Sequence, residues 1–67
     1  MVEVILNGKK AALPLILTYE DVVQFLGVDD LTITFRNSEA GDGTLAPGWG
    51  VMVKPGTVIN AIRTSGA

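Results

Sequence analysis

Apolar side chains recur at every second position at the start of the chain, at Val2, Val4 and Leu6. A period of two places these side chains on one face of a β-strand, so the pattern predicts a strand over residues 2–6. Asn7 and Gly8 follow directly, and both residue types tolerate the positive φ angles of a tight hairpin turn. The chain is therefore expected to open with a β-hairpin.

A second extended segment is expected over residues 10–16, where leucines alternate with other residues at Leu13, Leu15 and Leu17. Pro14 lies inside this segment and has no backbone N–H to donate to a neighbouring strand. We therefore place the predicted strand at an edge of the sheet.

A short amphipathic helix is predicted over residues 19–26. Its inward face consists of apolar residues at helical spacing, namely Tyr19, Val22, Val23 and Leu26. Thr18 is placed to cap the first turn, because its hydroxyl can accept a hydrogen bond from the amide of Asp21. The Asp21 carboxylate also suits the positive end of the helix, and Gly27 suits the left-handed residue that ends many helices.

Three further strands are predicted in the second half of the chain, over residues 31–36, 49–54 and 57–63. Alternating or β-branched residues mark them, and proline and glycine lie in the turns that precede the last two. Residues 37–43 are predicted to form a polar loop. Trp49 is expected to pack in the core, with an exposed anchor for a binding partner as the alternative.

This order of elements is typical of an α+β domain in which one helix packs on one face of a mixed four- to five-stranded sheet. We expect the first and last strands to pair in the middle of that sheet. Residues 1–64 form one domain in this interpretation, and residues 65–67, with their small side chains, form a flexible C-terminal tail.

Composition excludes several classes of function. The 67 residues include 5 lysines and arginines and 7 aspartates and glutamates, so binding of nucleic acid through positive charge is not expected. Without cysteine or histidine, the chain lacks thiolate metal sites, thiol nucleophiles and histidine bases. No stretch is apolar enough to span a membrane and no signal peptide is recognised, so we expect a cytoplasmic protein.

The remaining polar residues do not suggest a catalytic set. Glu20 and Asp21 fall at the start of the predicted helix, and Asp29 and Asp30 follow its end, so both pairs are interpreted as helix-stabilising or solvated. The serines have no neighbouring base in the sequence, and the glycines of residues 37–50 do not follow a phosphate-binding motif. We therefore predict that the protein is not an enzyme and holds no metal or cofactor.

One face of the sheet is expected to remain open. If Ile59 and Ala61 of the last strand point towards the helix, the opposite face carries a small partner-binding surface, whereas the alternative register reverses this arrangement. The residues of that predicted surface are Ile5, Met52, Asn60, Ile62 and Arg63.

Several short segments occur in a particular order along nearly the whole chain. They are the NGK turn at residues 7–9, TYEDVV at 18–23 ending at Gly27, LTITF at 31–35, GTLAPG at 43–48, VMVK at 51–54, Gly56 and VIN at 58–60. This ordered set resembles the bacterial multiubiquitin type of ubiquitin-like domain. The resemblance implies a ubiquitin-like β-grasp fold.

The resemblance also implies a protein modifier. In such a system an activating enzyme adenylates the C-terminal carboxylate, and a conjugating enzyme transfers the chain to target proteins through an isopeptide bond. A deconjugating metalloprotease is a further implied partner. Gly66 and Ala67 are the residues to which C-terminal activation is assigned. We expect a monomer that binds neither nucleic acid nor membrane.

Ubiquitin-like modifiers generally end in two glycines, whereas this sequence ends in Gly66 and Ala67. Either Ala67 is itself activated, or a peptidase first exposes Gly66, or the sequence belongs to a longer chain. Two alternative functions are a non-covalent protein-binding module that uses the open face, and a sulfur carrier whose C-terminus becomes a thiocarboxylate.

Overall fold

The computed structural model of the chain describes residues 1–64, and residues 65–67 lie outside the described part. Seven strands and one helix follow one another along these residues. They are β1 (Val2–Leu6), β2 (Lys9–Leu13), β3 (Ile16–Thr18), α1 (Tyr19–Leu26), β4 (Leu31–Ser38), β5 (Gly41–Leu45), β6 (Gly50–Met52) and β7 (Val58–Arg63).

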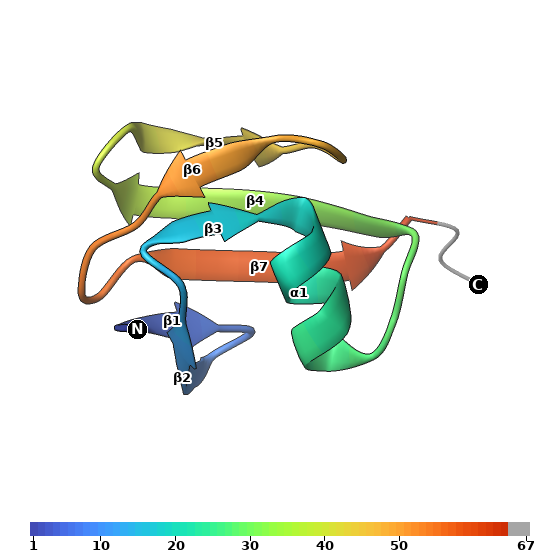
Figure 1. The fold of residues 1–67 in the computed structure, drawn as a ribbon, viewed down its shortest axis with the longest axis horizontal. Helices are drawn as coiled ribbons and strands as arrows, with labels where there is room; N and C mark the ends of the chain where they lie inside the picture. Colours follow the sequence, from blue (N-terminus) through green and yellow to red (C-terminus); the bar gives the residue numbers. More distant parts are fainter. Residues whose placement is uncertain (65–67) are drawn as a thin grey trace.

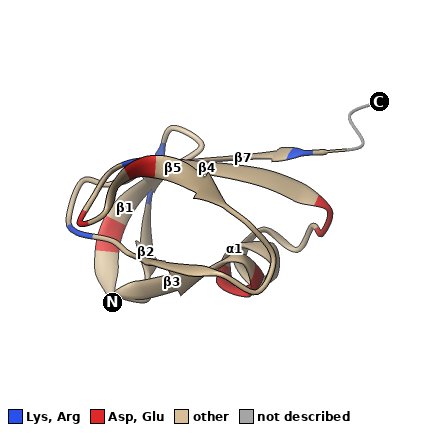
Figure 2. Cartoon of the chain, turned by 90° about the horizontal axis from the view of Figure 1, so that it is seen from above, with Lys and Arg blue, Asp and Glu red and all other residues tan. Residues whose placement is uncertain are grey.

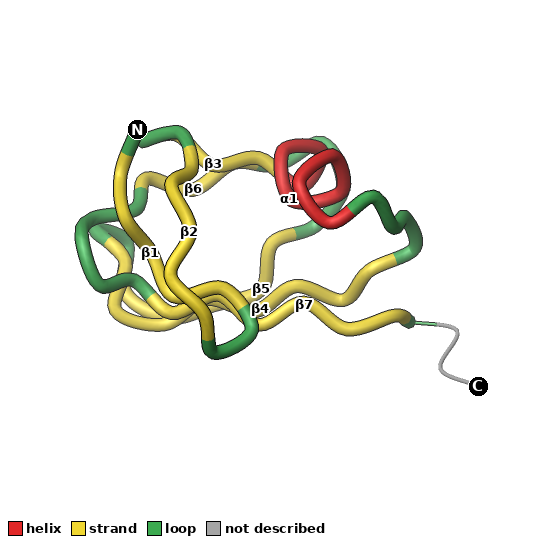
Figure 3. Tube along the Cα trace, turned by 90° about the horizontal axis from the view of Figure 1, so that it is seen from below, coloured by secondary structure: helices red, strands yellow, loops and turns green. Residues whose placement is uncertain are grey.

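The main sheet has five strands in the order β2-β1-β7-β4-β5, and a second, two-stranded sheet pairs β3 with β6 (Figure 1). The first and last strands, β1 and β7, pair in parallel, while the other neighbours are antiparallel. Figure 3 shows α1 and the β3–β6 pair together on one side of the main sheet. This α+β arrangement is that of a β-grasp, and the predicted central pairing is confirmed.

The core fills the space between these two layers. Seven side chains are less than 2 % exposed, namely Val4, Leu17, Val22, Ile33, Val53, Thr57 and Ile59. They come from β1, β3, α1, β4, β7 and the segment between β6 and β7, and all but the polar Thr57 belong to one apolar cluster. Strands β2, β5 and β6 add Leu13, Leu45 and Val51 to the same cluster. The inward positions predicted from the alternation of β1 and β4 are confirmed, and of the two registers left open for β7 the structure has the one with Ile59 and Ala61 inward.

The hairpin and the helix form where the sequence predicts them. Asn7 and Gly8 have φ angles of 50° and 82°, and they join β1 to β2 as a two-residue turn. The Thr18 hydroxyl accepts a hydrogen bond from the amide of Asp21 at 3.1 Å, and the Asp21 carboxylate accepts one from the amide of Thr18 at 3.1 Å. Gly27 ends the helix with a φ of 69°.

The predicted strand over residues 10–16 is wrong, because the chain bends at Pro14 and Leu15 and leaves the main sheet. β2 ends at Leu13, and β3 begins at Ile16 in the other layer, where it pairs with β6. Leu15 lies in the bend and is 49 % exposed instead of facing the core. The placement of β2 at an edge of the main sheet is confirmed.

The segment over residues 37–43 is not the polar loop that the sequence predicts, because β4 extends to Ser38 and β5 begins at Gly41. A Cβ atom added at Gly43 would lie 2.8 Å from Cζ of Phe35. Glycine therefore lets β5 pair with β4 while the ring of Phe35 stays buried between the strands and the core.

Tyr19 connects the start of the helix to the main sheet. The amide of Leu31 donates a hydrogen bond to the buried Tyr19 hydroxyl at 2.8 Å. Leu31 precedes the residues of β4 that pair with β5. Replacing Tyr19 with phenylalanine leaves this amide without its partner, and an unsatisfied buried donor costs about 1–3 kcal/mol. We expect Tyr19→Phe to lower the free energy of unfolding by that amount in urea titrations, whereas Gln24→Ala, at an exposed position of α1, should change it by less than about 0.5 kcal/mol.

Candidate functional site

The last strand ends at an exposed corner of the molecule, from which the C-terminal residues continue. Thr64 is held to the start of β4 by two hydrogen bonds: its amide donates to the Asp30 carbonyl at 2.7 Å, and its hydroxyl lies 2.8 Å from the Thr32 hydroxyl. Arg63 is the final residue of β7, where Figure 2 shows a basic position at the far end of the strand. Hydrogen bonds therefore hold the chain to the sheet as far as Thr64.

Asn7 fastens the same end of β7 from the other side. β1 pairs with β7 only through Ile5 and Leu6, but the Asn7 side chain continues the ladder beyond the end of β1. Its amide nitrogen donates to the Ala61 carbonyl at 3.1 Å, and its amide oxygen accepts from the Ala61 amide at 2.8 Å. A residue 54 positions away in the sequence thus fixes the strand shortly before the chain leaves the sheet.

Asn7→Gly separates this second role from the turn itself, because glycine keeps the positive φ of the hairpin and removes the side chain. The loss of two partly buried hydrogen bonds should cost about 1–2 kcal/mol of stability. The expected signature is faster hydrogen exchange at the Ala61 amide, with exchange at the Val4 amide changing only as much as global stability does. Equal acceleration at both amides would contradict a local role for Asn7.

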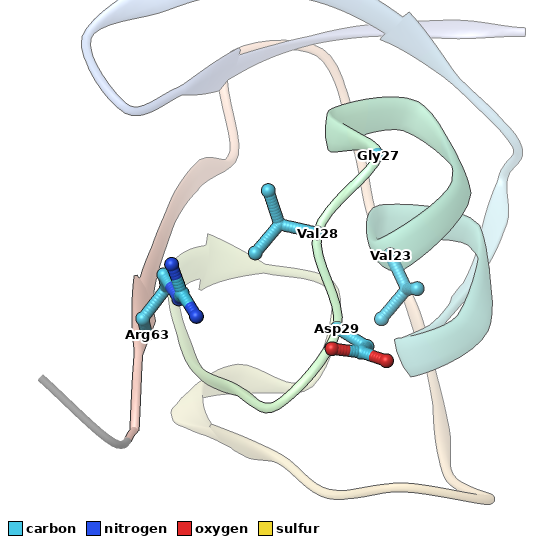
Figure 4. A pocket seen from close by; sticks show the side chains of 5 residues that line it. All are labelled: Val23, Gly27, Val28, Asp29 and Arg63. Atoms are coloured by element: carbon cyan, nitrogen blue, oxygen red, sulfur yellow. The ribbon is translucent and has the colours of Figure 1, made fainter.

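A shallow hollow of about 420 Å³ lies beside the end of β7. Its walls come from the C-terminal part of α1, the following loop and β7, and they contain Val23, Gly27, Val28, Asp29 and Arg63 (Figure 4). Arg63 and Asp29 give the hollow both a basic and an acidic side chain, while the valines supply apolar wall. The hollow therefore lies beside the end of the last described strand.

The open face of the main sheet is formed by the outward residues of its strands. In β7, Ile59 and Ala61 are buried and Asn60 and Ile62 point outward, which is the register that the predicted surface requires. Ile62 is 66 % exposed and lies opposite Thr32. Ile5 of β1 is half-buried and lies opposite Val58, which points to the same side of β7 as Ile62. Ile5 and Ile62 therefore share this face.

Met52 does not belong to this surface, so that part of the prediction is corrected. It lies in β6, directly opposite Ile16 of β3, and β6 pairs with β3 instead of joining the main sheet. Its side chain is exposed on the two-stranded sheet. The alternation gave the correct inward positions at Val51 and Val53 and the correct outward position at Met52, but not the strand with which β6 pairs.

The expectation that Trp49 packs in the core is also wrong, because its side chain is 70 % exposed. It follows Pro47 and Gly48 in a tight turn, in which the Trp49 amide donates to the Ala46 carbonyl at 3.0 Å. The turn motif was visible in the sequence, and a residue at the end of such a turn is often exposed. Trp49 is thus an accessible aromatic side chain.

The carboxylates near the helix have structural roles. Glu20 accepts a hydrogen bond from the amide of Gly48 at 3.2 Å, and Asp21 completes the helix cap described above. Within residues 1–64 no group of three or more acidic side chains could hold a metal ion. Among the same residues, α1 is neither long nor apolar enough to cross a membrane.

Gly66 and Ala67, the residues assigned to C-terminal activation, lie outside the described residues. The structure brings together Ile5, Asn60 and Ile62 on the open face of β1 and β7, and separates Met52 from them. The assignment of Arg63 to this face is also corrected, because Arg63 follows the inward positions of β7 and lines the hollow beside α1. Comparison with known protein families, with curated proteins and with solved structures finds no match to this chain.

Proposed function

We propose that this chain is a bacterial ubiquitin-like protein modifier. An activating enzyme adenylates its C-terminal carboxylate, a conjugating enzyme transfers it to target proteins, and a deconjugating metalloprotease removes it. The observation that supports this proposal best is the β-grasp arrangement, in which the central strand β7 runs out to an exposed corner next to the C-terminus. The resemblance of the ordered sequence segments points the same way.

The division between body and tail suits a carrier whose chemistry happens elsewhere. Hydrogen bonds from Thr64 and Asn7 fix the end of β7, so a partner enzyme can recognise a rigid surface. The three residues that follow, Ser65, Gly66 and Ala67, have small side chains that fit a narrow catalytic channel. A carboxylate at the end of such a segment reaches a buried active site without unfolding the body.

The proposed reaction is an acyl transfer. A carboxylate oxygen attacks the α-phosphate of ATP and pyrophosphate leaves, which produces an acyl adenylate. In the direct route a target ε-amino group attacks that carbonyl, and an amide forms as AMP leaves. Alternatively an enzyme thiol displaces AMP to form a thioester, and the ε-amino group then displaces the thiol to form the amide. The reacting carboxylate belongs to Ala67 or, if a peptidase acts first, to Gly66. Since ATP is consumed, the cytoplasm is the proposed compartment.

Recognition by these enzymes is assigned to the surface around the end of β7. Ile62 offers an exposed apolar contact, and Asn60 lies on the same face. Arg63 offers a charge next to the hollow that Val28 and Asp29 line. Buried apolar anchors and arginines often dominate the binding energy of an interface.

The test is adenylation of the purified chain. With ATP and a bacterial activating enzyme for ubiquitin-like proteins, we expect a mass gain of one AMP and chain-dependent exchange of labelled pyrophosphate into ATP. A chain that lacks residues 65–67 is the control and should support neither reaction. Absence of both signals with the intact chain contradicts the proposal, and a mass change of one oxygen replaced by sulfur indicates the sulfur carrier instead.

A non-covalent binding module is the second candidate, because Ile62 and Trp49 are exposed apolar side chains of a kind that serves as binding anchors. In that case the open face carries the function and the tail does not. Removal of residues 65–67 distinguishes the two, since partner binding should survive in the module and conjugation should be lost in the modifier.

A further inference from the structure

The turn between β1 and β2 places an asparagine directly before a glycine. Because Gly8 has no side chain, its backbone nitrogen is not shielded from the side-chain amide of Asn7. Both residues are exposed, and a Cβ atom added at Gly8 would meet no atom of the described residues within 4 Å. The other two asparagines, Asn37 and Asn60, precede residues that carry a side chain. Asn7 is therefore the asparagine of this chain with the least steric hindrance to a reaction with its own main chain.

The reaction open to such a pair is deamidation through a cyclic imide. The backbone nitrogen of Gly8 attacks Cγ of Asn7 and gives up its proton, a C–N bond forms, and the side-chain nitrogen leaves as ammonia. Solvent water then opens the five-membered ring. Addition of water to Cγ yields aspartate in a normal main chain, whereas addition to the main-chain carbon yields isoaspartate, in which the chain runs through Cγ. Water is consumed and ammonia is released, without an oxidant or a reductant.

Two hydrogen bonds hold the Asn7 side chain away from this reaction. Nδ2 of Asn7 donates to the Ala61 carbonyl at 3.1 Å, and Oδ1 accepts from the Ala61 amide at 2.8 Å; we call this pair of hydrogen bonds the Asn7 clamp. Ring closure turns Cγ back onto the nitrogen of Gly8, so both hydrogen bonds must break first. Since Gly8 itself is exposed, release of the Asn7 clamp is the barrier that the fold adds to the reaction.

Deamidation removes the donor of the Asn7 clamp. In aspartate an oxygen replaces the side-chain nitrogen, so an ionised carboxylate with two acceptors faces the Ala61 backbone. One oxygen can still accept from the Ala61 amide, but the other lies where the Ala61 carbonyl needs a donor. In isoaspartate the main chain gains an atom inside a two-residue turn that fixes the register of β1 and β2. Neither product restores both hydrogen bonds.

We propose that Asn7 is a site of self-catalysed deamidation, that the Asn7 clamp controls its rate, and that the products loosen the end of β7 irreversibly. Within the described residues β1 pairs with β7 only through Ile5 and Leu6, so the clamp is the last link between these two strands. The extent of deamidation thus depends on how long the clamp has been open. The reaction is independent of the C-terminal chemistry proposed above, so either proposal can fail without the other.

The rate of deamidation tests the protection. Trypsin releases residues 1–9 as one peptide, whose mass shows the exchange of an amide group for a hydroxyl, and chromatography separates its aspartate and isoaspartate forms. The reference is a synthetic peptide of residues 4–10, which contains Asn7 and Gly8 but not Ala61. At neutral pH it should react at least about tenfold faster than the folded chain, where two hydrogen bonds hold the side chain. In the chain unfolded by urea, Asn7 should react faster than Asn37 and Asn60.

Gly8→Asn tests the attacking nitrogen. Asparagine tolerates the positive φ of this position, and its side chain hinders the nitrogen that must approach Cγ. Deamidation of Asn7 should become several-fold slower, and the comparison is made with both chains unfolded in urea. A change of stability in the folded variant therefore does not affect the result.

An ester at residue 61 tests the clamp itself. Replacing Ala61 with lactic acid by chemical synthesis turns its N–H into an oxygen and removes one of the two hydrogen bonds without changing the turn. The folded chain should then deamidate about threefold to tenfold faster. The matched control is the same replacement at Ala40, whose amide donates to the Ser38 hydroxyl at 3.0 Å, and it should change the rate less than about twofold. Melting curves show whether both chains are folded.

Asn7→Asp tests the effect of the product. Loss of the donor should lower the melting temperature at neutral pH by about 4–8 °C, the shift expected when a domain of this size loses one such interaction. Asn60→Asp introduces the same charge at an exposed position of β7 and should lower it by less than about 2 °C.

The proposal is supported if Asn7 reacts fast in the peptide and in urea, slowly in the folded chain, and at an intermediate rate with the ester at residue 61. It is overturned if Asn7 does not react in urea, or if the peptide and the folded chain react equally fast. An unchanged rate with the ester at residue 61, or an Asn7→Asp chain as stable as the original, also overturns it.

Discussion

Ile59→Ala is expected to lower the free energy of unfolding by about 2–5 kcal/mol, the usual cost of truncating a fully buried aliphatic side chain. Ile59 has no solvent exposure and lies in the central strand, opposite Leu6 of β1 and Phe35 of β4. A cavity at this position removes contacts on both sides of β7. At about 0.05–0.15 kcal/mol per residue, a domain of this size has only about 3–10 kcal/mol in total. The variant should be largely unfolded or melt at a much lower temperature.

Ile62→Ala is the matched control, because it makes the same chemical change in the same strand at an outward position. Its free energy of unfolding should change by less than about 0.5 kcal/mol. Urea titrations followed by Trp49 fluorescence or far-UV circular dichroism compare the two. Similar losses of stability would mean that β7 does not have the register described here.

Deletion of residues 65–67 is expected to abolish conjugation while leaving the melting temperature nearly unchanged. The stabilising contacts of the C-terminal end are made by Thr64 and Ala61, which the deletion retains. The deletion should therefore remove conjugation without changing the stability of the folded domain. The two measurements are the amount of covalent conjugate in cells and the melting curve of the purified chain.

Deletion of Ala67 alone identifies the reacting residue. If a peptidase normally exposes Gly66, the shortened chain should conjugate as well as the intact one, or faster. If Ala67 itself is activated, conjugation should fall sharply. Persistence of conjugates after deletion of all three residues would contradict C-terminal attachment and would direct attention to the lysine side chains as donors of the link.

Local patterns predicted most of the fold because the interactions concerned are local. The Asn7–Gly8 turn and the Thr18 cap depend on residues that are neighbours in sequence, and the structure has both. The inward positions of β4 follow from a period of two that no tertiary contact overrides, whereas the same period left two registers open for β7. The pairing of β1 with β7, by contrast, was an expectation about the whole fold, and the order of the main sheet confirms it.

The errors arose where the chain changes layer. Pro14 was interpreted as the mark of an edge strand, yet the same residue also permits the bend that carries β3 into the second layer. Periodicity states which way a side chain points but not which strand lies beside it, and this is why Met52 was assigned to the wrong sheet. Strand β5 was missed because Gly41 and Gly43 hide its alternation.

The candidate site was predicted in part. The outward positions of Asn60 and Ile62 followed from the pattern of β7, given the register that the structure has. The clamp between Asn7 and Ala61 had no signal in the sequence, because it joins residues far apart and Asn7 already had a sufficient explanation in the turn.

The central claim, that the C-terminus becomes covalently attached to other proteins, is tested most directly by the peptide it leaves on them. Trypsin cuts after Arg63, so a modified lysine should carry a branch that begins at Thr64 and ends at Ala67, or at Gly66 after trimming. We predict such branched peptides in mass spectra of cells that make the intact chain, and none in cells that make the chain without residues 65–67. Abundant intact chain with a free carboxylate and no branched peptide would contradict the claim.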